Sequence, residues 1–331
     1  MVLLSVENLS KKFPVNKIGI ESYKSSTTAL NNITFQINQG ETLALIGESG
    51  SGKTTLARCI LRFIPPDKGR ILYQDRDILQ LSAKKFRILQ PKFQMIFQNP
   101  ALALNPRQTV GETIGEPLKV INGLKGLALH KRILQLLEMS GLESDLISRL
   151  PRQLSGGQQQ RVVIARALAP EPEFIIADEP TSSIDAVFKK QIMQLLKGLQ
   201  KKLGLTLLLI SHDLDLVADI SDRTAVLYKG SLVEIGRTDL VVKSQLHPYT
   251  HQLLKFSHYD DLESLSFGNV TGRNDSSAKG CIFKEECAFV KEECLNICPD
   301  RSSVSEEHSV ACHFSFDFGL REVNTLTGSE S

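Results

Sequence analysis

The residues from Gly47 to Thr54 have the composition and spacing of a loop that binds the phosphates of a nucleotide. They read Gly-Glu-Ser-Gly-Ser-Gly-Lys-Thr, which fits the pattern G-x-x-x-x-G-K-[ST] in full. Glycines let backbone N–H groups curl around phosphate oxygens, and the dipole of a following helix adds to the attraction. Lys53 would reach the β- and γ-phosphates, and Thr54 would hold Mg²⁺ through its hydroxyl. The predicted phosphate site comprises Gly47, Glu48, Ser49, Gly50, Ser51, Gly52, Lys53, Thr54 and Thr55.

A second segment supplies two carboxylates at the end of an apolar run. Residues 174–177 are apolar and are followed directly by Asp178 and Glu179. An apolar strand ending in acid is common, so this feature indicates a function only together with the phosphate loop. Asp178 would then bind Mg²⁺ through water, and Glu179 would polarise the water that attacks the nucleotide. The two motifs together predict a nucleotide hydrolase.

The segments around these motifs predict an α/β fold. Helical stretches, such as 131–139 and 189–203, lie between short β-rich apolar runs. This alternation is typical of a largely parallel sheet with both faces covered. The apolar runs are residues 42–46, 70–73, 174–177, 205–210, 225–228 and 232–235.

Three further segments have a composition of their own. We expect residues 14–28, which are polar, to form a surface loop between early strands. Residues 88–170 contain few strand signals and indicate a helical insertion. Residues 255–277 are rich in Ser, Asp, Asn and Gly, which is typical of a linker, and a cysteine-rich tail follows.

Length and composition exclude several classes of protein. The 331 residues suggest two domains at roughly 150 residues each. With 41% hydrophobic and 23% charged residues the chain is ordinary globular protein, and its net charge of +2 does not favour a polyanion partner. The longest apolar run, 203–210, is much shorter than the roughly 20 residues of a membrane-spanning helix. The first residues lack the features of a secretory signal, so we expect no export.

A third motif specifies the kind of nucleotide hydrolase. Residues 154–158 read Leu-Ser-Gly-Gly-Gln, and here the sequence resembles the ATP-binding subunits of ABC transporters, whose signature this is. The resemblance implies that the signature contacts the ATP bound by an opposite subunit, through Ser155, Gly156, Gly157, Gln158 and Asp185. Gln98 matches the Q-loop, 182–185 the D-loop and His212 the switch histidine. The resemblance therefore implies Glu179, His212 and Gln98 as catalytic residues, Thr54, Gln98 and Asp178 at Mg²⁺, and Phe13 stacked on adenine.

Two further stretches resemble one branch of that family. Residues 94–100 and 104–107 are similar to the QMVFQDP…LNPR stretch of oligopeptide, dipeptide and nickel importers, and 247–250 read His-Pro-Tyr-Thr as theirs do. The resemblance implies an ABC-type P-loop domain over 1–250, with a helical subdomain at about 88–165, and a small cysteine-containing C-terminal extension over 251–331. Glu286-Cys287-Ala288 stands where relatives have Arg-Cys-Pro, and Cys298 is an additional cysteine.

The extension carries a set of cysteines that could bind a metal. Since we expect no export, these thiols favour a metal or cluster over disulfides. Thiolates can enclose one iron–sulfur cluster or one tetrahedral zinc, and the spacing alone does not choose between these and free or redox-paired thiols. The resemblance implies a [4Fe–4S] cluster. We expect Cys298 to be a spare thiol and Cys59 to be a small buried hydrophobe. The candidate ligands are Cys281, Cys287, Cys294 and Cys312.

The resemblance also implies the setting in which the chain works. It predicts an ATPase that powers uptake of peptides, nickel or related solutes, peripherally bound at the cytoplasmic face of the inner membrane. The implied partners are two permease subunits, a second ATPase subunit (a paralogue or a second copy) and, indirectly, an extracytoplasmic solute-binding protein, with no nucleic acid. Alternatives are an ABC ATPase that acts on DNA or ribosomes, and a redox-sensing ABC ATPase. The single motif set and the short separation of Lys53 from Ser155 disfavour the first.

Overall fold

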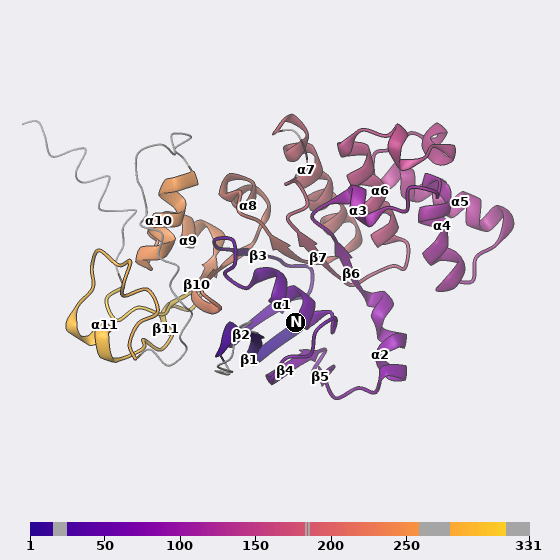
Figure 1. Cartoon of the computed structure of the whole chain (residues 1–331). Helices are drawn as coiled ribbons and strands as arrows, with labels where there is room; N and C mark the ends of the chain where they lie inside the picture. Colours follow the sequence, from indigo (N-terminus) through magenta and orange to yellow (C-terminus); the bar gives the residue numbers. More distant parts are fainter. Residues whose placement is uncertain (16–24, 183, 185, 258–278, 316–331) are drawn as a thin grey trace, which may run out of the picture. The chain divides into compact units, whose positions relative to one another are not determined.

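The computed structural model of the chain describes residues 1–15, 25–182, 184, 186–257 and 279–315 (Figure 1). It divides into two compact units, which are described one at a time. The first comprises Met1–Leu4, Ile37–Thr42 and Asp77–Ser211, and the second comprises Ser5–Gln36, Leu43–Arg76 and the chain from His212 onward. Residues 258–277 of the predicted linker and 16–24 of the loop expected at 14–28 lie outside the described residues. The described ends of these segments are not loop: residues 255–257 belong to a helix, Pro248–Ser257, and residues 14–15 and 25–28 belong to strands, Val2–Val15 and Ser25–Asn38.

The first unit contains a parallel sheet and most of the helices. Strand β7 (Phe174–Asp178) pairs with β6 (Phe93–Ile96) on one side and β8 (Thr206–Ile210) on the other, and every residue of β7 and β8 is buried. The helices are α2 (Ala83–Leu89), α3 (Pro100–Ala103), α4 (Val110–Val120), α5 (Gly126–Met139), α6 (Gly156–Leu168) and α7 (Ala186–Leu203), with 3₁₀ turns at Gln90–Lys92, Ser144–Ser148 and Pro151–Gln153.

The predicted helical insertion is visible in this unit as α3 to α6, and α4, α5 and α6 pack against one another (Figure 1). Thr109 and Glu112 form a capping box at the start of α4, which satisfies backbone N–H groups that a helix start leaves unpaired. The region expected to be poor in strands does contain one, β6, whose four residues Phe-Gln-Met-Ile are too few to show a period clearly.

The second unit contains two sheets. Its N-terminal sheet has the order β2-β1-β4-β5, with β1 (Val2–Val15), β2 (Ser25–Asn38), β4 (Lys68–Tyr73) and β5 (Arg76–Asp77). In the other sheet β3 (Thr42–Ile46) runs parallel to β9 (Arg223–Tyr228), and β10 (Ser231–Arg237) is antiparallel to β9. The helices are α1 (Lys53–Ile60), α8 (Leu214–Ile220), α9 (Thr238–Ser244), α10 (Pro248–Ser257) and α11 (Glu292–Asn296).

The cysteine tail is joined to this second sheet. Strand β12 (His308–Val310) pairs antiparallel with β10, and β11 (Ser302–Ser305) pairs with β12. The sequence did not predict these two short strands. These two strands of the tail therefore extend the same sheet as β3, the strand that leads into the phosphate loop.

Among the described residues no helix has both the length and the apolar character needed to cross a membrane.

Candidate functional site

The predicted phosphate loop connects β3 to α1, as its motif requires. Gly47 and Gly52 have φ angles of 148° and 108°, which L side chains rarely adopt. A Cβ atom on Gly47 would collide with the Leu227 carbonyl oxygen, and one on Gly52 with the Ala29 carbonyl oxygen. The loop therefore needs glycine at both positions, because of the backbone conformation and the close neighbouring strands.

Lys53 is buried and folded into its own loop. Its Nζ donates to the carbonyl oxygens of Gly47 at 2.6 Å and Glu48 at 2.7 Å, and to the Ser51 hydroxyl at 3.4 Å. Thr54 and Thr55, the next two residues, are half-buried in the first turn of α1. The ammonium group is thus fixed at the loop, where the motif predicts a phosphate contact.

The loop has a further contact that the sequence analysis missed. The Glu48 N–H donates to the Tyr249 hydroxyl oxygen at 2.9 Å, although the two residues are 201 positions apart. Tyr249 belongs to the His-Pro-Tyr-Thr motif at the start of α10 and is fully buried. The His-Pro-Tyr-Thr motif does draw attention to Tyr249, but the sequence analysis used it only to identify the branch of the family. It did not indicate a contact between Tyr249 and the phosphate loop.

His247 shapes the turn that presents Tyr249. Burial lowers the pKa of His247 to about 3, so the imidazole is neutral at pH 7. Its Nδ1 accepts the Tyr249 N–H at 3.0 Å, and the His251 N–H donates to the His247 carbonyl oxygen. His247 thereby caps the first turn of α10, and Pro248 follows it where a helix tolerates proline. These contacts give His247 a structural role in the turn.

Phe13 and His212 are the other residues of the second unit that the sequence predicts at the ATP site. Phe13 is half-buried near the end of β1, and the Lys11 ammonium lies 5.5 Å from its ring centroid. Lys11 is itself held by Asp67 at 3.0 Å. His212 is exposed and follows directly after Ser211.

The first unit brings together two predicted catalytic residues. The Gln98 side-chain amide donates to the Glu179 carboxylate at 2.7 Å, across 81 positions of the chain. Asp178 is buried at the end of β7. Glu179 has a φ of 47°, a left-handed conformation that is costly for a residue with a side chain, and its N–H donates to the Ile210 carbonyl oxygen at 2.9 Å. The backbone at Glu179 is thus strained and fixed, a combination that often marks functional sites.

The signature residues form an exposed helix start. Ser155 caps α6, since its side chain accepts the Gln158 N–H while the Gln158 side chain accepts the Ser155 N–H. Ser155 and Gly156 are exposed, and Gly157 and Gln158 are half-buried. A helix N-terminus at the surface favours an anionic ligand. Asp185, the predicted D-loop aspartate, lies outside the described residues.

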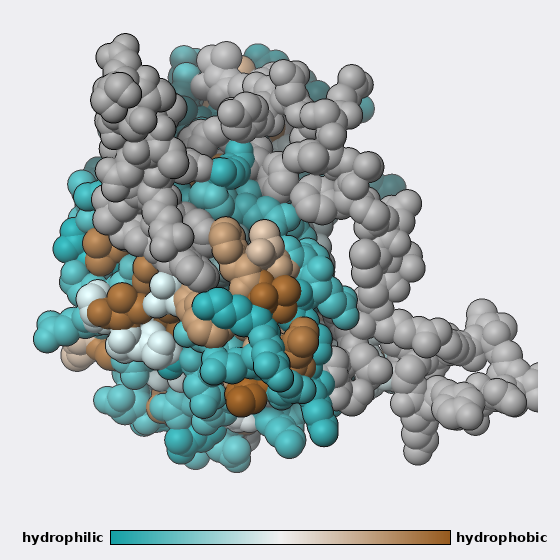
Figure 2. All heavy atoms as spheres, turned by 90° about the vertical axis from the view of Figure 1, so that its left-hand side faces the viewer, coloured by the Kyte–Doolittle hydropathy of each residue, from teal (hydrophilic) through white to brown (hydrophobic). Residues whose placement is uncertain are grey.

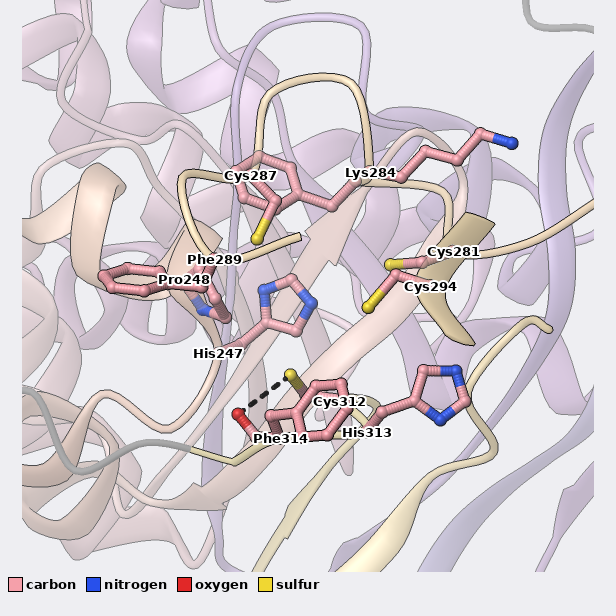
Figure 3. Close-up of a pocket in the computed structure, with 11 residues that line it drawn as sticks. His247, Pro248, Cys281, Lys284, Cys287, Phe289, Cys294, Cys312, His313 and Phe314 are labelled. Atoms are coloured by element: carbon pink, nitrogen blue, oxygen red, sulfur yellow. Dashed lines mark hydrogen bonds between the residues drawn. The ribbon is translucent and has the colours of Figure 1, made fainter. Parts of the chain in front are cut away.

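The four candidate cysteine ligands of the tail line one pocket together with His247, Phe283 and His313 (Figure 3). In the view of Figure 3 the sulfur atoms of the four cysteines lie above, to the right of and below the imidazole of His247. Burial raises the pKa of the Cys312 thiol to about 11, and the pKa values of Cys281 and Cys287 are also raised by burial. Within the described residues, however, no three His, Cys, Asp or Glu side chains are arranged to hold one metal ion. The structure therefore gives no support to the cluster or to zinc.

A buried carboxylate was also missed by the sequence analysis. Glu234, on β10, is fully buried and accepts the N–H groups of Leu246 at 3.0 Å and His247 at 2.9 Å. The signal was one acidic residue inside the apolar run 232–235. A charge in such a place is seldom buried without partners.

Comparisons with known proteins agree with these geometries. Residues 30–182 match the family model described as ABC transporter, and residues 233–294 match the one described as Oligopeptide/dipeptide transporter, C-terminal region. The chain is 40% identical to the putative oligopeptide transport ATP-binding protein YkfD of Bacillus subtilis over 321 residues, which cover 94% of this chain and 95% of that protein. It is 38% identical to the oligopeptide transport ATP-binding protein OppF of Haemophilus influenzae, covering 94% and 96%.

Solved structures show the same fold. The dimeric bacterial ABC transporter cassette MJ0796 is similar with a TM-score of 0.63 and 33% identity, over 71% of this chain and 99% of that one. The cbiO1 protein of Clostridium perfringens, part of the ABC transporter complex cbiONQ, is similar with a TM-score of 0.65 and 30% identity, over 78% and 98%.

Proposed function

The chain belongs to the ABC transporter family, as an ATP-binding, ATP-hydrolysing subunit of the oligopeptide/dipeptide branch, and on this premise we propose that it powers the uptake of peptides through an import complex. The observation that carries the proposal is the union of two features in one unit. The phosphate loop and the branch-specific C-terminal region contact each other through Glu48 and Tyr249.

The predicted site residues receive their roles within this proposal. The phosphate loop, with Lys53 and Thr54, binds the phosphates and Mg²⁺, to which Asp178 and Gln98 also contribute. Glu179 orients the attacking water, and its hydrogen bond from Gln98 supports this role because the amide fixes the carboxylate. His212 assists at the γ-phosphate, and Phe13 stacks on adenine.

The signature helix acts on a second subunit. The exposed start of α6, with Ser155, Gly156, Gly157 and Gln158, caps the γ-phosphate of ATP held by the opposite ATPase, and Asp185 joins this contact. That ATPase is a paralogue or a second copy. Two ATP molecules would then hold the two ATPase subunits together, and hydrolysis of the ATP would let the subunits separate.

The complex proposed around this subunit includes two permease subunits and, indirectly, an extracytoplasmic solute-binding protein. The subunit sits peripherally at the cytoplasmic face of the membrane. We assign residues 1–250 to the ABC ATP-binding domain, with its helical subdomain at about 88–165, and residues 251–331 to the extension. The run of helices α3 to α6 supports the subdomain.

A metal centre at Cys281, Cys287, Cys294 and Cys312 stays a prediction. Four thiols that line one pocket are a suitable donor set for an iron–sulfur cluster, or for zinc as the alternative, once they are deprotonated. As placed they are not grouped around one ion. No step of ATP hydrolysis is assigned to this centre.

Peptide uptake in cells tests the proposed function. Cells that lack the chromosomal copy are complemented with the wild-type chain or with Lys53→Ala, and uptake of a radiolabelled tripeptide and of ⁶³Ni²⁺ is measured. We expect Lys53→Ala to abolish tripeptide uptake and to leave ⁶³Ni²⁺ uptake unchanged. Tripeptide uptake that survives Lys53→Ala would refute the proposal, and loss of nickel uptake alone would identify nickel as the cargo.

A further inference from the structure

We propose that Tyr249 is a positioning residue of the phosphate loop, and that Phe283 of the cysteine tail holds Tyr249 in position. The inference rests on the proposed function, because it takes residues 47–54 as the ATP phosphate site. It assigns to the C-terminal extension a direct part in ATP binding.

The first step is the way in which one peptide group of the loop is held. The N–H of Glu48 donates to the Tyr249 hydroxyl at 2.9 Å, and the carbonyl oxygen of the same peptide group, which belongs to Gly47, accepts from Lys53 Nζ at 2.6 Å. Gly47, which contributes the carbonyl of this peptide group, has a φ of 148°, in a region open mainly to glycine. A glycine leaves the neighbouring peptide free to rotate, so the hydrogen bond to Tyr249 adds a second restraint, from outside the loop, to the one that Lys53 supplies.

The orientation matters for binding an anion. A phosphate loop works because successive backbone N–H groups point inward together. A loop that already has this shape binds without first losing conformational freedom, so its affinity is higher than that of a loop that must be ordered. Loss of the Tyr249 hydroxyl should therefore weaken ATP binding more than it slows the chemical step.

The second step is the way in which Tyr249 is held. Its ring centroid lies 4.5 Å from that of Tyr228 and 5.7 Å from that of Phe283, and the Tyr228 and Phe283 rings meet edge to face at 5.2 Å. Tyr249 and Phe283 are 0% and 2% exposed. Packing this dense leaves the Tyr249 ring little room to move, so its hydroxyl stays opposite Glu48.

The third step connects this cluster to the tail. Phe283 lies two residues after Cys281, and both line the pocket that also contains Cys287, Cys294 and Cys312. Glu286 of the same segment accepts from the Tyr228 hydroxyl at 2.6 Å and pairs with Lys229 at 3.0 Å. The tail is thus attached to the end of β9 by an aromatic contact and by an ion pair, and the aromatic residue Phe283 also packs against Tyr249, the residue that holds the loop.

A matched pair of hydroxyl deletions tests the first half of the proposal. Tyr249→Phe removes the hydroxyl that accepts from Glu48, whereas Tyr228→Phe removes a hydroxyl of the same cluster that donates to Glu286. The Kd for labelled MgATP is measured on the full chain, and KM and kcat are measured on the chain purified together with its transport subunits. One neutral hydrogen bond corresponds to about a 2- to 12-fold change in affinity.

We expect Tyr249→Phe to raise Kd and KM within that range with kcat changed less than about twofold, and Tyr228→Phe to leave both within about twofold. Hydrogen exchange of the Glu48 amide supplies a direct readout, and it should become faster in Tyr249→Phe only. Equal effects of the two variants, or an unchanged KM in Tyr249→Phe, would overturn the proposal, because either result makes the hydroxyl irrelevant to the loop.

Phe283→Leu tests the second half and also covers the case in which Tyr249→Phe does not fold. This variant should raise KM and accelerate hydrogen exchange of the Glu48 amide. The double variant with Tyr249→Phe should show no further rise in KM, because both changes act through the same hydrogen bond between Glu48 and Tyr249. Additive effects, or normal Glu48 exchange in Phe283→Leu, would overturn it. Lys53→Ala distinguishes the two proposals: if it retains ATP binding, the proposed function fails, and if it loses binding while Tyr249→Phe is normal, only this inference fails.

Discussion

The imidazole of His308 lies against the carboxylate of Glu234, with Nε2 2.8 Å from Oε1, and both side chains are almost completely buried. The same carboxylate accepts the N–H groups of Leu246 and His247. One buried carboxylate on β10 therefore joins the start of the His-Pro-Tyr-Thr turn to strand β12 of the cysteine tail.

Glu234→Gln should destabilise this junction. The amide NH₂ of glutamine cannot accept from a backbone N–H, so one of the three donors around Glu234 is left buried and unpaired. We expect a loss of about 1–3 kcal/mol in the free energy of unfolding, measured by urea titration. Limited proteolysis should also cut the tail sooner. Glu306→Gln, an exposed position beside β12, is the control and should change neither measurement; wild-type stability in Glu234→Gln would contradict the role of the junction.

Glu179→Gln should separate ATP binding from hydrolysis. Glutamine keeps a polar side chain near Gln98 but removes the carboxylate that orients water, so the rate should fall by about 10²-fold or more. Binding of labelled ATP should persist. Glu171→Gln, an exposed glutamate just before β7, should hydrolyse ATP normally. Turnover retained in Glu179→Gln would exclude Glu179 as the base.

Ser155→Arg should block the contact of the signature helix with the ATP of the opposite subunit. It should leave ATP binding at the phosphate loop of the same chain intact. The exposed N-cap of α6 would carry a bulky cation in place of a hydroxyl, so ATP should still bind the isolated chain but no longer drive dimerisation. Light scattering with ATP present, in a Glu179→Gln background, measures the dimer. Ser82→Arg changes an exposed N-cap serine at α2 and should dimerise as the parent does. Equal loss of ATP binding and dimerisation in Ser155→Arg would argue against a trans role.

The cysteine prediction is tested by metal content. If the tail holds an iron–sulfur cluster, anaerobically purified chain contains about four iron and four sulfide per molecule. Cys294→Ser changes a buried thiol of the pocket and should remove the iron, whereas Cys298→Ser changes an exposed thiol and should not. Stoichiometric zinc with no sulfide would show that the tail holds a zinc site and not a cluster. A chain that contains no metal would refute both predictions.

Because Cys59 is buried, we expect the free energy of unfolding to fall at alkaline pH. Burial raises the pKa of its thiol to about 11 from a reference value of 9.0, so the unfolded chain releases this proton at lower pH than the folded chain does. Stability contributed by Cys59 is therefore complete below pH 9 and falls by up to about 1.4 kcal/mol per pH unit between pH 9 and 11. Urea titrations at pH 8 and pH 10 measure the loss, and Cys59→Ala should make it smaller. An unchanged pH dependence in Cys59→Ala would refute the assignment.

Much of the fold follows from local signals in the sequence. The strand at 42–46 was predicted with the bounds of β3, and the strand at 174–177 extends by only Asp178 in β7, because buried parallel strands are continuous apolar runs. Cys59 was expected to be buried and is 0% exposed. These features depend on neighbours along the chain, which a single sequence displays.

Contacts between distant segments could not be predicted in the same way. Nothing near Glu48 indicates that its N–H meets Tyr249, and nothing near Gln98 fixes its distance from Glu179. Strands β11 and β12 form from mostly polar residues because β10 offers a partner, and not because of their own periodicity. Exposed apolar residues of the tail were likewise missed; they are Phe289, Val290, Leu295, Ile297 and Val304. Figure 2 shows brown apolar residues among teal polar ones on the face that it draws.

Because the backbone at Glu179 is left-handed, a substitution there can raise the cellular level of the protein while it abolishes transport. Glycine adopts a φ of 47° without the penalty that glutamate incurs, so Glu179→Gly should relieve local strain and resist unfolding better than the parent chain. The same change deletes the carboxylate assigned to water activation. In a library of variants sorted by cellular protein level, Glu179→Gly should therefore rank high. In the same library sorted by growth on peptide, it should rank with the inactive variants. Selection for transport, acting against selection for stability, is what would keep glutamate at this position.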